Sequence, residues 1–157
     1  MPITQSRLLI VSILILLIGL QTTVTSSADQ PAVKFDEFGD VNCEEEMARL
    51  DSFAVNLQAR PHTKGAIIFY GGKTFRGRSP RRGDAAARAA RLKPYLVRRR
   101  GLPADRVIII NGGYAEHWYA ELWVIYSGMP SPDPNTQVRG VKFRKGIAHP
   151  RDFRCQI

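Results

Sequence analysis

The sequence predicts an α+β domain in which two helices pack on one face of a mixed four-stranded sheet. Short apolar or alternating runs, typical of strands, are separated by two longer segments with apolar residues at helical spacing. The predicted order is strand, helix, strand, helix, strand, strand. Two strand-helix-strand units imply parallel neighbours joined by right-handed crossovers, which place both helices over the sheet. The chain of 157 residues is long enough for one such core.

The first strand and helix follow from residues 33–58. Apolar and polar residues alternate from Val33 to Phe38, as in a half-buried strand. Asn42 can cap a helix, and Glu45 three residues later completes a capping-box pattern. The predicted core-facing residues of this helix are Met47, Leu50, Phe53, Ala54 and Leu57.

The second strand and helix are separated by a polar loop. The run "GAIIFYGG" (65–72) predicts a strand buried on both sides, and "KTFRGRSPRRGD" (73–84) predicts the loop. Asp84 is the expected cap of the second helix, and Gly101 its end. Pro94 lies inside this helix and predicts a bend there. The predicted apolar face is Ala85, Ala89, Leu92 and Leu96.

The last two strands come from "RVIIIN" (106–111) and "HWYAELWVIY" (117–126), with a turn expected at "GGY" (112–114). We assign residues 29–126 to the domain. Residues 127–157 form a Pro-rich linker and a basic C-terminal tail, in which Val138 to Phe143 could add one short edge strand.

Residues 1–28 have the pattern of a signal peptide. Arg7 precedes the apolar run Leu8 to Leu20, and Ser26 and Ala28 predict cleavage after Ala28. The alternative is an uncleaved anchor, but such a run spans about 20 Å as a helix, whereas the bilayer core is roughly 30 Å thick. We therefore expect an exported protein, in the periplasm or at the outer membrane, with no transmembrane segment in the mature chain.

The two cysteines, Cys43 and Cys155, lie near opposite ends of the mature chain. In an exported protein such a pair predicts a disulfide, which would tie the tail back to the domain. Two buried thiols are the alternative. Neither cysteine has neighbours at a spacing typical of zinc ligands, so no metal site is predicted.

The charge of the chain bears on partners rather than on fold. Lysine and arginine total 23 against 14 acidic residues, a net charge of +9. Charge alone admits anionic glycans, anionic lipids and nucleic acid, but export disfavours nucleic acid. Nothing predicts an enzyme or a cofactor: Asp36 and Glu37 point to opposite faces of a strand, and the histidines are scattered (His62, His117 and His149).

The segment "RAARLKPYLVRRRGLPADRVIIINGGYAE" (88–116) resembles the second half of the OmpA-like C-terminal domain. "VKFDEFGD" (33–40) is similar to the first strand of that family and "GAIIFYGG" to its second, so the resemblance covers roughly 33–125. It implies the βαβαββ sandwich fold of the family. It also implies non-covalent binding of peptidoglycan through the diaminopimelate of the stem peptide.

In that family an Asp after the second strand takes the ligand's ammonium group, and a helical Arg takes its carboxylate. Arg88 matches the Arg, but Lys73 stands at the position of the Asp, and His117 to Tyr119 replace an Asn-Arg-Arg signature. The reversed charge predicts poor binding of the free zwitterion. If Lys73 and Arg88 face one pocket, they could instead clamp a dianion.

The loop is crowded with cations. Its backbone amides and the following helix N-terminus would favour an anion, although a charge run is more often a solvated surface. The predicted ligand-binding residues are Lys73, Arg76, Arg78, Arg81, Arg82 and Arg88. Trp118, Tyr119 and Trp123 could stack on sugars, with core packing as the alternative.

These observations predict an exported envelope-binding module of the OmpA-like type, which associates with peptidoglycan or another anionic envelope polymer. The alternative is a structural or interaction protein that kept the fold and lost the ligand. In that case the basic loop would bind an acidic protein partner.

Overall fold

The computed structural model describes residues 32–75, 77–135 and 138–153, and it confirms the α+β fold class. The strands β1 (Val33–Phe38), β2 (Lys64–Gly72), β4 (Val107–Ala115) and β5 (Tyr119–Ile125) form one sheet in the order β1-β5-β2-β4. The β1–β5 and β5–β2 pairs are antiparallel, whereas β2 and β4 are parallel. The sheet is therefore mixed, as predicted, and β2, one of its two interior strands, is almost wholly buried.

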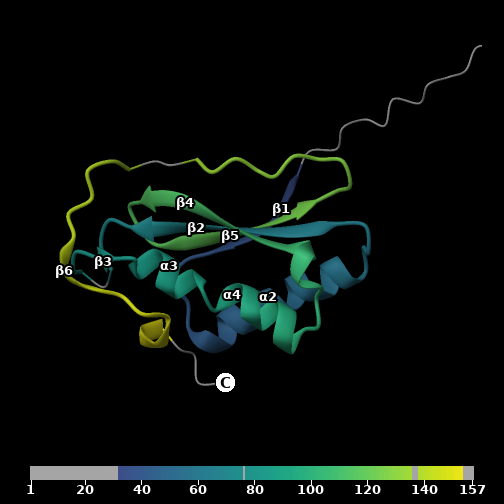
Figure 1. Cartoon of the computed structure of the whole chain (residues 1–157), viewed down its shortest axis with the longest axis horizontal. Coiled ribbons are helices and arrows are strands. Elements are labelled where there is room, and N and C mark those ends of the chain that lie inside the picture. The colour runs from purple at the N-terminus through teal and green to yellow at the C-terminus, as the bar shows by residue number, and fades with distance from the viewer. Residues whose placement is uncertain (1–31, 76, 136–137, 154–157) are drawn as a thin grey trace, which may run out of the picture.

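The helices α2 (Cys43–Gln58), α3 (Asp84–Ala89) and α4 (Leu92–Pro94) cover one face of the sheet (Figure 1). The main hydrophobic core lies between this helical layer and the sheet. Its largest fully buried side chains include Leu50, Phe53, Leu57, Ile67, Leu92, Leu96 and Leu122. Within the described residues, no helix is long and apolar enough to cross a membrane.

Helix α2 begins as predicted, because the Asn42 side chain accepts a hydrogen bond from the Glu45 amide at 2.9 Å. The Glu45 carboxylate bonds Arg49, one turn along the helix. Met47 is only partly buried, and Glu46 takes a buried position beside the predicted core residues. Glu46 is tolerated there because it pairs with Arg91.

The second predicted helix is broken, but the break lies before Pro94. The chain leaves the α-helix at Ala90 and Arg91, and after α4 it forms a π-helical turn, Tyr95–Arg99. A proline ring conflicts with the carbonyl four residues earlier, here that of Ala90, so the disruption precedes the proline. Gly101, at φ 69°, ends the segment as predicted.

Asp84 is not a helix cap, which corrects the prediction. Gly83, at φ 81°, precedes the helix, and Asp84 is its first residue. The Asp84 carboxylate instead accepts hydrogen bonds from the backbone N–H and the Nε–H of Arg81. The carboxylate therefore holds Arg81, near the end of the loop 73–84, against α3.

The predicted turn at 112–114 is wrong, because β4 continues to Ala115. Asn111 pairs with Phe69 and Tyr114 with Gly71, so two residues of β4 face one residue of β2. This is a β-bulge, and Gly113 adopts the φ of 83° that it requires. The chain turns after Ala115, at residues 116–118.

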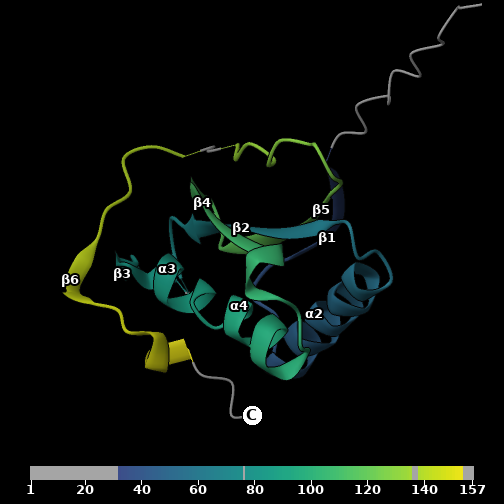
Figure 2. The same cartoon turned by 45° about the vertical axis from the view of Figure 1, so that its right-hand side comes forward.

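The tail crosses the face of the sheet that the helices leave open (Figures 1 and 2). The Asn135 amide donates to the Tyr70 hydroxyl at 3.1 Å, and the Val138 amide donates to the Tyr114 carbonyl at 3.0 Å. A second apolar cluster lies on this face. It consists of Ile68, Tyr70 and Ala115, with Ile110, Tyr119 and Trp123 packed against them.

The predicted edge strand at Val138 to Phe143 is wrong. The strand of the tail is β6 (Arg144–Ile147), which pairs in parallel with β3 (Arg81–Arg82) in a separate two-stranded sheet. Strand β6 thus pairs with the loop 73–84 instead of the main sheet. Because the paired residues are 63 and 65 positions apart in the chain, sequence periodicity carried no signal of this pairing.

Candidate functional site

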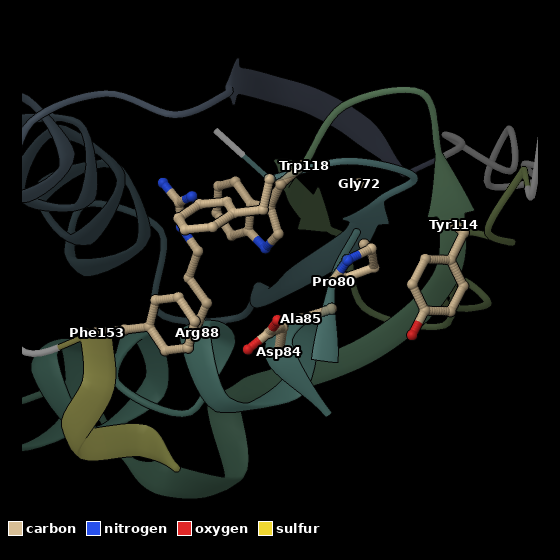
Figure 3. Close-up of a pocket in the computed structure, with 10 residues that line it drawn as sticks. Gly72, Pro80, Asp84, Ala85, Arg88, Tyr114, Trp118 and Phe153 are labelled. Atoms are coloured by element: carbon tan, nitrogen blue, oxygen red, sulfur yellow. The ribbon is translucent and has the colours of Figure 1, made fainter. Parts of the chain in front are cut away.

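Arg88, the family-like arginine of the helix, is buried at the centre of the candidate site. It lies on α3 and is only 3% exposed. Its guanidinium carbon is 3.8 Å from the centroid of the Trp118 ring and 5.6 Å from that of Phe75. Figure 3 shows the side chain extending from α3 toward Trp118. The stacked rings hold the planar guanidinium in one orientation.

One nitrogen of this guanidinium has an ionic partner. Arg88 Nη2 is 2.7 Å from the Asp40 Oδ1 atom, and Asp40 lies in the connection between β1 and α2. Arg88 Nε and Nη1 are buried, and no acceptor within the described part of the chain bonds them. Each unpaired buried donor costs about 1–3 kcal/mol, a cost that a bound anion would remove.

The electrostatic environment of Arg88 favours an anionic partner. Burial lowers the pKa of Arg88 from its ordinary value, and the neighbouring Asp40 partly opposes this effect. An arginine nevertheless stays protonated in proteins, so the site keeps its positive charge. A buried charge of this kind is stabilised by a group that both neutralises it and accepts its hydrogen bonds.

A small cavity of about 10 Å³ adjoins Arg88 (Figure 3). It has room for about one water molecule. Trp118 lines this cavity, and its buried indole N–H has no hydrogen-bond acceptor among the described residues. The other lining residues are Gly71, Gly72, Phe75, Pro80, Asp84, Ala85, Tyr114 and Phe153.

A larger groove opens beside Arg88, with a volume of about 380 Å³. It contains two guanidinium groups, from Arg88 and Arg91, and two carboxylates, from Asp40 and Asp152. Val41, Asn42, Cys43, Phe75 and Phe153 complete its lining. Such a groove can hold a carboxylate or phosphate on its guanidinium side and a cationic group on its carboxylate side.

A second groove, of about 420 Å³, shares the lining residues Phe75 and Asp40 with the first. Its lining otherwise consists of Gly39, Thr74, Gly77, His117 and Trp118. The turn before β5, where the sequence departs from the OmpA-like signature, therefore supplies a wall of the site.

The C-terminal turn Pro150–Phe153 builds another wall. The Phe153 ring packs edge-on against Phe75, with 5.9 Å between centroids. Arg91 donates to the Phe153 carbonyl while it pairs with the buried Glu46. Arg81 Nη2 is 2.8 Å from Asp152 Oδ2. The buried Glu46 thus stabilises this wall indirectly, because it orients the Arg91 side chain that bonds Phe153.

The loop cations that the structure describes do not join Arg88 in one pocket. Lys73 is exposed, pairs with Glu116 at 3.4 Å, and lines neither of the two grooves. Arg82 stacks on Phe143, with 4.9 Å to the ring centroid. Arg78 lines a separate groove. Arg81 is held by Asp84 and Asp152, and Arg76 lies outside the described residues.

The aromatic residues divide between the two faces of the sheet. Trp118 belongs to the main core, where it contacts Arg88. Tyr119 and Trp123 share the opposite face, as the alternation predicts, and Tyr119 stacks on Tyr70 at 4.3 Å. The Trp123 indole donates to Glu121. Tyr119 and Trp123 are half-buried and are part of the second apolar cluster.

Several site residues were missed by the sequence prediction: Asp40, Phe75, Arg91, Asp152 and Phe153. Arg91 alone had a signal, since its position three residues after Arg88 puts both on one helical side.

The exposed Cys43 begins α2 and lines the groove, whereas Cys155 lies outside the described residues, so their pairing stays a prediction. Among the described residues, no cluster of His, Cys, Asp and Glu could hold a metal ion.

No protein-family model matches the chain, and no curated protein shows significant similarity to it. The resemblance to OmpA-like domains therefore depends on the segments quoted above and stays a prediction.

Proposed function

We propose that this protein is an exported cell-envelope binding module of the OmpA-like type. It associates non-covalently with peptidoglycan or another anionic envelope polymer, and Arg88 receives an acidic group of that polymer. The observation that carries the proposal is the buried Arg88 guanidinium, whose Nε and Nη1 have no acceptor among the described residues.

The geometry around Arg88 suits an acidic group. Nε and Nη1 point from different edges of the guanidinium, so each can donate a separate charge-assisted hydrogen bond to an acidic oxygen. Trp118 and Phe75 restrict rotation of the guanidinium plane, so little conformational entropy is lost on binding. The open groove beside Arg88 gives a polymer side group a route to these donors.

The strand order supports the same family of function. A mixed β1-β5-β2-β4 sheet with helices on one face is the arrangement that the resemblance implies. The resembling segments 33–40, 65–72 and 88–116 contribute to β1, β2, α3 and β4 in the expected order. Fold by itself does not fix function, so Arg88 carries the proposal.

A second candidate is an interaction protein that kept the fold and lost the ligand. Asp40 already occupies one nitrogen of Arg88, and Phe153 forms a wall over the site. Under this hypothesis Arg88 would serve mainly to join α3 to the loop after β1.

Retention of the protein on purified sacculi separates the two candidates. We compare wild type with Arg88→Gln, which removes the charge, and with Arg88→Lys, which keeps the charge but loses the planar guanidinium with its several donors. Arg98→Gln is the matched control, because Arg98 is an exposed cation on the helical segment that does not line the Arg88 grooves. Circular dichroism verifies that each variant is folded.

The proposal predicts retention by wild type and Arg98→Gln, with at least a tenfold loss in both Arg88 variants. It also predicts that part of the binding survives moderate salt, because a hydrogen-bonded buried charge is less screened than surface charges. Equal retention of wild type and folded Arg88→Gln would favour the interaction protein.

A further inference from the structure

The loop 73–84 and the C-terminal tail together form a basic ribbon, which we define as residues 78–82 and 142–147 and which contains β3 and β6. The Arg144 amide donates to the Pro80 carbonyl at 3.0 Å, and the Ala148 amide donates to the Arg82 carbonyl at 3.3 Å. In this register Arg81 and Arg144 are direct partners. The fold thus places cations from two distant segments on neighbouring strands.

This arrangement is electrostatically costly, because like charges directly opposite each other on paired strands repel. Arg81 is compensated by Asp84 and Asp152. The ribbon carries five further cations with exposed side chains: Arg78, Arg82, Lys142, Arg144 and Lys145. Among the described residues, no salt bridge to a carboxylate is found for any of these five.

A groove of about 340 Å³ lies between the two segments of the ribbon, lined by Phe75, Arg78, Ser79 and Arg144. Arg144 Nε donates to the Ser79 carbonyl at 3.1 Å, which fixes the direction of its guanidinium. The backbones of Phe75 and Arg78 bond each other in both directions, at 2.7 and 3.1 Å, so Arg78 projects from a tight hairpin. Two guanidinium groups therefore flank a groove of defined shape.

We propose that this groove binds one acidic group of a linear polyanion, while the other ribbon cations bind neighbouring acidic groups. The cations follow two extended segments, in which alternate residues are roughly 6.6 Å apart, a spacing that suits a chain of repeated acidic groups. Ile147 is the exposed large hydrophobic side chain of the ribbon, which is too little to anchor it in a membrane. The inference rests on the proposed function only for the presence of acidic envelope polymers, because neither Arg78 nor Arg144 lines the Arg88 grooves.

The test measures binding of the purified protein to fluorescent polyphosphate and fluorescent poly-glutamate over a series of salt concentrations. Arg78→Gln/Arg144→Gln is compared with Arg98→Gln/Arg99→Gln, which removes the same charge from exposed arginines outside the ribbon. The single variant Arg78→Gln keeps the Arg144 hydrogen bond to Ser79, so a loss of binding in this variant cannot come from loosening of the ribbon. Phosphatidylglycerol vesicles and Arg88→Gln complete the set.

We expect wild type to bind at least one polymer and the ribbon double variant to bind it at least tenfold more weakly at 0.1 M salt. Arg78→Gln should lose about threefold and the control double variant less than twofold. The salt slope should fall by about 1.4 in the ribbon double variant, since each contact to a single-stranded polyanion contributes about 0.7. The polymer that binds more tightly identifies the acidic group as phosphate or carboxylate.

Equal losses in both double variants would overturn the inference, because net charge alone would then explain binding. The inference would also be overturned if the wild-type protein bound the vesicles but neither polymer. Polymer binding that persists in Arg88→Gln, whatever the result with sacculi, supports a separate site. Loss of polymer binding in folded Arg88→Gln would instead assign the polyanion to the Arg88 pocket and refute the ribbon.

Discussion

The guanidinium of Arg88 lies 3.8 Å from the centre of the Trp118 ring, and both side chains are buried. Arg88 comes from α3, while Trp118 comes from the turn before β5. A desolvated cation–π contact of this kind contributes about 2 kcal/mol. The contact therefore joins the helical layer to the sheet at the point where the open grooves meet.

Asp40→Asn should lower stability and raise affinity for acidic groups. The substitution removes the anionic partner of Arg88 Nη2, although Asp40 is partly exposed, so we expect a loss of about 1–2 kcal/mol in urea unfolding. It also frees a cationic donor, so retention on sacculi should increase at low salt. Asp133→Asn, at an exposed position in the linker, is the control. Unchanged stability and retention would contradict a structural role for this ion pair.

Gly72→Ala should destabilise the site. A Cβ at this position would lie 2.5 Å from the Thr74 carbonyl oxygen and 2.7 Å from the Trp118 amide nitrogen. Both are backbone atoms, so the loop after β2 or the turn before β5 must shift, at a cost of about 2–3 kcal/mol. Gly39→Ala is the matched control, because its Cβ would meet no atom closer than 3.5 Å. Similar thermal midpoints for the two variants would refute the prediction.

The second apolar cluster should weaken at alkaline pH. Burial is the main cause that raises the pKa of Tyr119 from 10.0 to about 12. Between these values the unfolded chain has lost the phenol proton while the folded chain keeps it, so stability decreases as pH rises through this window. Urea unfolding at a series of pH values measures the effect. Tyr119→Phe should reduce the slope, and an identical slope in both proteins would count against it.

Cys43 and Cys155 should be joined. We expect no free thiol in the native protein under oxidising conditions, and one free thiol in Cys43→Ser. Reduction should lower the free energy of unfolding by about 4–5 kcal/mol in the chain-entropy model, because the bridge would close a loop of more than 100 residues. Two titratable thiols in the unreduced wild type would refute the pairing.

The mature protein should begin near Asp29. The apolar run Leu8 to Leu20 and the small residues Ser26 and Ala28 predict removal of residues 1–28, which lie outside the described part of the chain. N-terminal sequencing of protein from envelope fractions measures the start directly. Recovery of Met1 or Pro2 would show that the segment is retained.

The sequence by itself predicted the layers of the fold, because local patterns encode them. The alternation in 33–38, the helical spacing after Asn42 and the apolar run at 65–72 each depend on residues close together in the chain. Two of the errors in the predicted elements were local too. The helix breaks before Pro94 because the proline ring conflicts with the carbonyl of Ala90, four residues earlier. The turn predicted at 112–114 is absent because a β-bulge lets β4 continue through Gly112 and Gly113.

The surroundings of Arg88 were decided only by the tertiary structure. A resemblance of sequence pointed to Arg88, but Asp40, Phe75, Trp118 and Phe153 reach it from four other segments. The register of β6 on β3 likewise joins residues more than 60 positions apart. Neither the contacts around Arg88 nor the β3–β6 register leaves a periodic pattern in the sequence. Both depend on which distant segments the folded core brings together.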